Sequence, residues 1–214
     1  MKQATSLCRR RWLLNLTLLG ALAWPGLCAA QPVSSSPAPS RPALPGDSVY
    51  QIPAVMVDQN GQTFKLQERR GQPVLVSMFY NSCQFVCPML IEAMRGTEQK
   101  LTAEERKHLS MMLITFDPAR DDVKALKAVF DKRELDPARW TLARTDAASV
   151  RKIAATLGIQ YRLLADGDYN HTTVLILLDV DGRILGRTNK IGGTDPAFVK
   201  LVRQAVQAAS QHAS

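Results

Sequence analysis

Residues 74–88 read VLVSMFYNSCQFVCP, an apolar run that leads into two cysteines four positions apart. A nearly continuous apolar run of this length is typical of a strand that is covered on both faces. A proline at position 88 suits the first turn of a helix, because it lacks only an amide hydrogen that would be unpaired there. We therefore predict a strand over 73–80, a loop that carries the cysteines, and a helix over 88–100.

The two cysteines, Cys83 and Cys87, indicate a chemical rather than a structural role. A disulfide between them would close a very short loop, and the stabilisation that a disulfide gives grows with loop length. We expect Cys87 to lie just before the helix, whose positive end favours a thiolate over a thiol. Two thiolates can bind a soft metal ion such as Cu(I) or cycle between dithiol and disulfide. Redox proteins of the thioredoxin type use Cys-x-x-Cys, and this pair has one residue more, which favours metal binding only slightly.

The rest of the domain alternates predicted strands with predicted helices. Asn60-Gly61 and Asp181-Gly182 each lie between two strand-like runs and predict β-hairpins. Two further strands are expected, over 111–116 and 140–143, and three further helices, over 122–132, 147–157 and 195–211. This alternation predicts a mostly parallel sheet with helices on both faces, to which the hairpins add antiparallel strands. The order matches a thioredoxin-like α/β fold with a central mixed sheet, an N-terminal hairpin and a late hairpin insertion.

The first thirty residues have the layout of an export signal. A basic start without acidic residues precedes a short apolar core over 12–24, and Cys28-Ala29-Ala30 ends the segment. The apolar core is short for a membrane span of roughly 20 residues. Cleavage after Ala30 is expected, with an uncleaved anchor as the alternative, and Arg9-Arg10 hints at twin-arginine export. We therefore expect the protein in the periplasm or on the outer face of the cytoplasmic membrane.

The mature chain divides into a linker and one domain. Residues 31–48 are rich in proline, serine and alanine and read as an extended linker, and 49–210 form the domain. Residues 1–30 hold four basic and no acidic residues, which leaves 23 basic and 19 acidic residues and a net charge of +4. No basic stripe with interleaved aromatic residues occurs in the sequence, so nucleic-acid binding is not supported. We expect a monomer that contacts a membrane only through 1–30, if these residues are uncleaved.

One histidine is a candidate third ligand. His108 lies in a charged stretch and reads as a solvated helix residue, and His212 lies in the C-terminal tail. His171 precedes an apolar strand, and taken alone it reads as a histidine in a turn. In a thioredoxin-like layout, however, its loop faces the cysteine loop. Cys83, Cys87 and His171 would then give an S/S/N site whose softness suits copper.

The methionines of the domain read as side chains that fill the core, because they lie in apolar runs. We do not expect any of them to be a copper ligand. They are Met78, Met89, Met94, Met111 and Met112.

Three segments in order resemble the Sco/SenC family of thioredoxin-like copper proteins, with similarity over about 53–198. They are Phe79-Tyr80 followed by Cys83-x-x-x-Cys87-Pro88, Phe116-Asp117-Pro118-Ala119-Arg120-Asp121, and Tyr169-Asn170-His171-Thr172 leading into Leu177-Leu178-Asp179-x-Asp181-Gly182-Arg183. The resemblance implies copper delivery to the dinuclear copper site of cytochrome c oxidase. It implies Cys83, Cys87 and His171 as copper ligands, and it gives the loop residues Asp117, Arg120 and Asp121 a supporting role.

The chain departs from the family pattern at three positions. Gln84 and Phe85 stand where the family commonly has proline and an acidic residue, and Asn170 stands where it commonly has aspartate. The missing carboxylate beside His171 removes a negative charge and a hydrogen-bond acceptor, and such outer partners tune metal affinity. We therefore expect a copper affinity or preferred oxidation state that differs from that of typical members.

Three functions remain open from the sequence. The first is a copper metallochaperone, a transfer protein rather than an enzyme, with a copper donor and an oxidase subunit as partners. The second is an envelope thiol-disulfide oxidoreductase that uses Cys83 and Cys87, in exchange with a thiol reductant protein, to reduce the copper-binding cysteines of its client. A thiol peroxidase fits the fold less well, because its resolving cysteine usually lies further from the reactive one.

Overall fold

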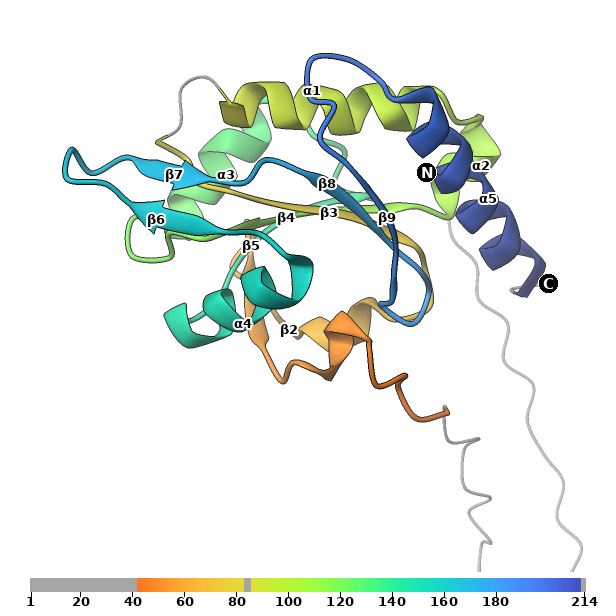
Figure 1. Ribbon diagram of the computed structural model, residues 1–214, viewed down its shortest axis with the longest axis horizontal. Coiled ribbons are helices and arrows are strands. Elements are labelled where there is room, and N and C mark those ends of the chain that lie inside the picture. The colour runs from red at the N-terminus through yellow and green to blue at the C-terminus, as the bar shows by residue number, and fades with distance from the viewer. Residues whose placement is uncertain (1–41, 83–85, 213–214) are drawn as a thin grey trace, which may run out of the picture. The chain divides into compact units, whose positions relative to one another are not determined.

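The computed structural model describes residues 42–82 and 86–212, which contain a seven-stranded sheet and a separate two-stranded sheet (Figure 1). The strands are β1 (Val55–Asp58), β2 (Thr63–Lys65), β3 (Val74–Phe79), β4 (Ser110–Thr115), β5 (Trp140–Arg144), β6 (Tyr161–Leu163), β7 (Tyr169–His171), β8 (Leu175–Leu178) and β9 (Ile184–Thr188). The helices are α1 (Val86–Gln99), α2 (Ala103–Lys107), α3 (Val123–Lys132), α4 (Ala147–Leu157) and α5 (Pro196–His212), with short 3-10 helices η1 (Val49–Gln51) and η2 (Leu66–Arg69).

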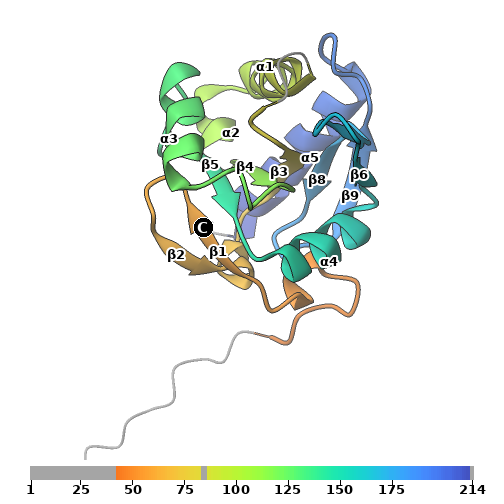
Figure 2. The ribbon, with the colours of Figure 1, turned by 90° about the vertical axis from the view of Figure 1, so that its left-hand side faces the viewer.

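The large sheet is mixed, with the order β2-β1-β5-β4-β3-β8-β9. Only its centre is parallel, where β4 pairs with β3 and with β5, and the flanking pairs are antiparallel. Helix α1 lies on one face and α4 on the other (Figures 1 and 2). The prediction of a central mixed sheet covered on both sides is confirmed. The expectation that the sheet is mostly parallel is wrong, because only the three middle strands pair in parallel.

Strand β3 lies in the middle of the core, as its apolar sequence predicts. All six of its residues are buried. It pairs with β4 on one side and β8 on the other, and Val76 lies opposite both Met112 and Ile176. Because β3 is covered on every side, its carboxyl end has a fixed place from which the cysteine segment starts.

Helix α1 begins at Val86, two residues before the predicted start at Pro88. Cys87 is therefore inside the first turn, whereas we predicted it just before the helix. The physical reason is that the first four amide hydrogens of a helix have no partner within it. A proline is therefore tolerated anywhere in the first turn, and it does not fix the first residue.

The segment 161–171 contains a hairpin that the sequence analysis did not predict. Strands β6 and β7 pair antiparallel, with Tyr161 opposite His171. The strand-like run that precedes Asp181-Gly182 forms a strand only from Leu175 onward. His171 thus belongs to a small hairpin of its own and not to the start of the strand that follows it.

Residues 42–48, which the sequence assigned to the linker, contact the domain. The Arg70 guanidinium donates to the Pro42 carbonyl at 2.5 Å, and the Gln51 side chain donates to the Leu44 carbonyl at 3.2 Å. The packed domain therefore includes this stretch. The predicted export segment 1–30 lies outside the described residues. Within 42–82 and 86–212, no helix has both the length and the apolar character needed to cross a membrane.

The two predicted Asn-Gly and Asp-Gly turns offer a matched test of packing. Gly61 and Gly182 both have positive φ angles, +77° and +82°. A Cβ on Gly182 would lie 2.5 Å from the Tyr50 ring, whereas a Cβ on Gly61 would meet only Val123 at 3.8 Å. An alanine would be strained by the positive φ angle at both positions. At position 182 its Cβ would also clash with the Tyr50 ring.

We predict that Gly61→Ala destabilises the protein by about 1–2 kcal/mol, the cost of a left-handed conformation for an ordinary residue. Gly182→Ala should cost about 1–3 kcal/mol more, because the ring of Tyr50 must move. Urea denaturation of the two variants measures both values. Equal losses would contradict the close packing of residues 48–50 against the β8–β9 turn.

Candidate metal centre

The ring of His171 packs on two aromatic residues at the ends of the central strands. Its centroid lies 5.1 Å from that of Phe116 and 5.6 Å from that of Tyr80. Tyr80 directly follows β3 and Phe116 directly follows β4. His171 therefore lies beyond the carboxyl ends of the parallel strands, where open α/β sheets place their sites.

The hydrogen-bonding environment of His171 defines which ring nitrogen can bind a metal. Nδ1 lies 3.3 Å from the Thr172 carbonyl oxygen. A carbonyl only accepts, so the neutral ring carries its hydrogen on Nδ1 and keeps a lone pair on Nε2. Nε2 is therefore the nitrogen that could act as a ligand.

The described residues on either side of the cysteine segment lie at the same end of the domain. Cys87 is in the first turn of α1, while Cys83 lies outside the described residues. Figure 1 shows the end of β3, the beginning of α1 and the β6–β7 hairpin together on the left. His108 follows α2 and His212 ends α5, both at the opposite end of Figure 1, so the fold does not bring them to this site.

A buried carboxylate joins the segment after β3 to the loop after β4. Asp121 Oδ2 accepts from the Asn81 amide at 3.0 Å and from the Thr115 hydroxyl at 2.5 Å. Burial raises the pKa of Asp121, and these two hydrogen bonds oppose that rise. Asp121 thereby fixes the backbone two residues before Cys83.

A second carboxylate acts through an arginine. Asp117 is buried and forms an ion pair with Arg120. The Arg120 Nη1 donates to the Gly167 carbonyl at 2.8 Å, and the guanidinium lies 5.4 Å from the centre of the Tyr169 ring. Arg120 thus connects the loop after β4 to the β6–β7 hairpin.

Three residues of this region, Tyr80, Tyr161 and Asp168, had no role predicted from the sequence. The Tyr80 hydroxyl donates to the Asp168 carboxylate, and the Tyr161 ring stacks on Phe116 with 5.1 Å between centroids. Aromatic residues at 161 and 169 on either side of Asp166-Gly167 are a signal that could have indicated the hairpin. Nothing in the sequence joins Tyr80 to Asp168, which lie 88 positions apart.

The prediction that the methionines fill the core is confirmed for four of the five. Met78, Met94, Met111 and Met112 are buried. Met89, which we assigned to the core, is 48% exposed on the first turns of α1. Its exposed position breaks the 3.6-residue spacing of the buried face of the helix, which the apolar run in the sequence concealed.

Asn170 does not point with its neighbours. Tyr169 and His171 are half-buried, and Asn170 between them is exposed. Side chains alternate between the two faces of a strand, so the Asn170 side chain lies on the face away from the aromatic residues. Its position makes a direct acceptor role toward His171 unsuitable, and any effect of Asn170→Asp on copper would act through charge alone.

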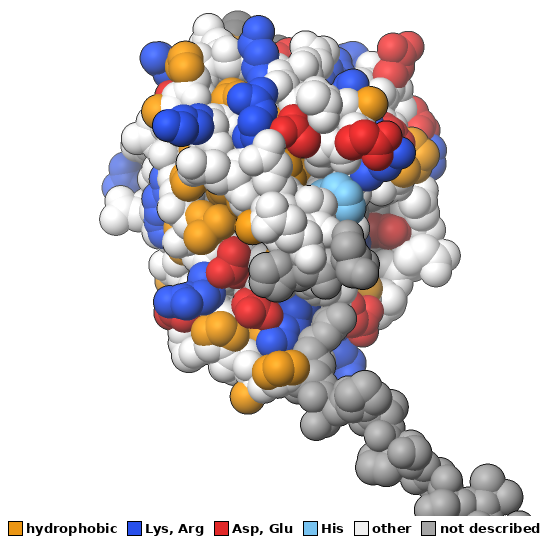
Figure 3. Space-filling view, turned by 90° about the vertical axis from the view of Figure 1, so that its right-hand side faces the viewer, with side chains coloured by type: hydrophobic (Ala, Val, Ile, Leu, Met, Phe, Trp, Pro, Cys, Tyr) orange, Lys and Arg blue, Asp and Glu red, His pale blue; other side chains and the backbone are white. Residues whose placement is uncertain are grey.

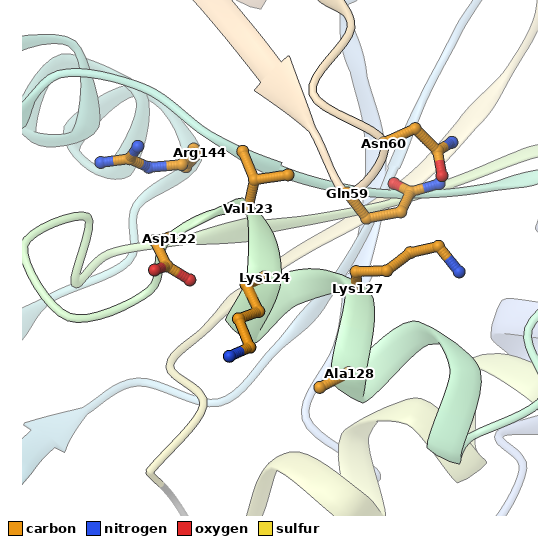
Figure 4. A pocket seen from close by; sticks show the side chains of 8 residues that line it. All are labelled: Gln59, Asn60, Asp122, Val123, Lys124, Lys127, Ala128 and Arg144. Carbon is orange, nitrogen blue, oxygen red and sulfur yellow. The ribbon is translucent and has the colours of Figure 1, made fainter.

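The molecule has a further groove away from His171. The groove in Figure 4 lies between the β1–β2 turn and α3 and is lined by Gln59, Asn60, Asp122, Val123, Lys124, Lys127, Ala128 and Arg144. It contains none of the predicted ligands, and Lys127 is paired with Asp131 at 2.5 Å.

On the face shown in Figure 3, charges of both signs are interspersed rather than gathered in a basic stripe.

Among the described side chains, no three histidine, cysteine, aspartate or glutamate residues lie close enough to hold a metal ion. The side chains of Cys83 and Cys87 fall outside that description. The predicted ligand set therefore depends on these two thiols together with the described His171.

Comparison with known proteins identifies relatives of the chain. A family model described as SCO1/SenC matches residues 45–206. A candidate copper-binding protein of Stutzerimonas stutzeri is 29% identical over 135 residues, which are 61% of this chain and 65% of that protein. The matched part thus spans just under two thirds of that relative's length.

Two solved structures have a similar fold. The copper-bound structure of ScoI from Bradyrhizobium japonicum has a TM-score of 0.58 at 22% identity and covers 74% of this chain and 96% of its own. BsSco has a TM-score of 0.62 at 21% identity and covers 74% and 92%. It is described as a member of the Sco family of cytochrome c oxidase assembly proteins in which a disulfide switch was identified. These likenesses confirm the predicted thioredoxin-like fold class, and because the family model spans most of its length, the chain belongs to the SCO1/SenC family.

Proposed function

We propose that this protein binds one copper ion through Cys83, Cys87 and His171 and delivers it to the dinuclear copper site of cytochrome c oxidase. The observation that carries the proposal is the position of the His171 ring. It packs on Tyr80, three residues before Cys83, at the end of the domain where α1 begins with Cys87 in its first turn. Family membership supports copper as the metal, since one relative is named for copper binding and another structure holds copper.

The donor chemistry suits copper. Two thiolates and one imidazole are soft and intermediate ligands, which Cu(I) and Cu(II) both accept. The positive end of α1 favours the thiolate of Cys87, and the hydrogen bond from Nδ1 to Thr172 leaves Nε2 of His171 as the donor atom. The aromatic rings against His171 shield one side of the imidazole from water.

Transfer is a natural function of such a site. Three protein ligands leave room for a ligand of a copper donor or of the acceptor subunit to enter before a cysteine or His171 leaves. BsSco is a member of a family of cytochrome c oxidase assembly proteins, which supports an oxidase subunit as the acceptor of the copper ion. The export-like residues 1–30 support a location in the periplasm or on the outer face of the cytoplasmic membrane.

A thiol-disulfide oxidoreductase is the second candidate. The disulfide switch identified in BsSco favours it, and the pair Cys83 and Cys87 could exchange with the copper-binding cysteines of a client. This activity needs the two thiols but not the imidazole, so His171 distinguishes the two functions.

We predict that the reduced protein binds about one Cu(I) per chain and that His171→Ala lowers the affinity at least about tenfold, since even outer partners of a ligand are worth that much. Cys83→Ser and Cys87→Ser should each abolish tight binding. Competition with a chromophoric Cu(I) chelator measures these affinities, and His108→Ala is the matched control. Full affinity in His171→Ala would contradict the ligand set.

We further predict that His171→Ala separates delivery from thiol chemistry. Cells that carry this variant should assemble cytochrome c oxidase with a depleted dinuclear copper site, although the purified variant still exchanges with a model disulfide at the parent rate. Copper content of the isolated oxidase and exchange kinetics are the two measurements. A normal copper content of the oxidase in cells with His171→Ala, combined with a reduced copper content in cells with Cys83→Ser, would favour the oxidoreductase function instead.

A further inference from the structure

The hairpin that carries His171 is held to the domain by side chains. Strands β6 and β7 form their own sheet and are not hydrogen-bonded to the seven-stranded sheet. A lone two-stranded hairpin is at best marginally stable in water. The position of His171 relative to the cysteine segment therefore depends on contacts between the hairpin and the ends of β3 and β4.

Two kinds of contact hold the hairpin. The rings of Tyr161, Tyr169 and His171 pack on Tyr80 and Phe116, and such packing fixes proximity but tolerates sliding. Two directional hydrogen bonds end on the turn between β6 and β7. The first runs from the Tyr80 hydroxyl to the Asp168 carboxylate, and the second from Arg120 to the Gly167 carbonyl at 2.8 Å.

We infer that the hydrogen bond between Tyr80 and Asp168 sets the position of His171 relative to the cysteine pair, which makes Tyr80 and Asp168 positioning residues for the metal. This inference rests on the proposed copper site. Tyr80 lies three residues before Cys83, and Asp168 lies three residues before His171. Three residues span at most about 10 Å, so this one bond ties the two ligand-bearing segments together close to both ligands.

The burial of the two partners suits this role. Tyr80 is 2% exposed, and its ring is packed by Phe116, Tyr169 and His171, so the direction of its hydroxyl is fixed by the core. Asp168 is exposed and also accepts from the Tyr169 amide at 3.0 Å. The hydrogen bond from the buried Tyr80 to Asp168 on the hairpin turn therefore orients the hairpin from outside the β6–β7 strand pairing.

The test is a double-mutant cycle on Cu(I) affinity in the full chain, measured by chelator competition. Tyr80→Phe removes the hydroxyl and keeps the ring, and we expect about a tenfold loss of affinity, as is typical of outer partners of a metal ligand. In the His171→Ala background the same change should have no further effect, because it acts through the imidazole. Tyr50→Phe is the control, since the Tyr50 hydroxyl donates to the Arg69 carbonyl at 3.4 Å, outside the hairpin that carries His171.

Each outcome decides the inference. A loss that appears only when His171 is present supports it, and Asp168→Ala, a change at an exposed position, should give the same result if Tyr80→Phe folds poorly. Equal losses in both backgrounds, no loss in either positioning variant, or an equal loss in Tyr50→Phe would overturn it. Parent affinity in His171→Ala would overturn the proposed ligand set itself and the positioning role with it, whereas reduced affinity in His171→Ala without an effect of Tyr80→Phe overturns the positioning role alone.

Discussion

The parallel pairing of β3 with β4 is the interaction on which the proposed site depends. Phe79 lies opposite Thr115, and the Phe116 amide donates to the Phe79 carbonyl at 2.9 Å. The next residues of the two strands, Tyr80 and Phe116, are thereby brought together with 5.2 Å between ring centroids. The ring of His171 packs on these two rings, and the burial of β3 on all sides keeps them in place.

Hydrogen bonds near these rings connect three segments that are far apart in the sequence: the segment after β3, the loop after β4 and the β6–β7 hairpin. Asp121 joins the cysteine segment to the loop after β4, and Arg120 joins that loop to the His171 hairpin. Both side chains come from a single five-residue loop whose other acid, Asp117, holds Arg120 in place. The supporting role that the family resemblance implies for this loop thus has a physical form: Asp121 holds the segment that leads to Cys83, and Arg120, paired with Asp117, holds the hairpin that carries His171.

The sequence predicted the elements whose signals are local. The apolar run of β3 and the glycines of the two main hairpins both reflect short-range constraints, and each element was found near its predicted place. The β6–β7 hairpin was missed because its strands are three residues each and its stability comes from rings on other strands. The Tyr80–Asp168 link and the exposure of Met89 likewise depend on tertiary packing, which no local pattern encodes.

In the proposed site, one imidazole and two thiolates bind the same copper ion. X-ray absorption spectroscopy of the Cu(I)-loaded protein reports the donor atoms directly, because sulfur and nitrogen ligands scatter differently and an imidazole ring adds outer-shell features. We expect two sulfur donors and one imidazole nitrogen, with the imidazole signal lost in His171→Ala. A copper bound by sulfur alone, or a spectrum unchanged by that substitution, would contradict it.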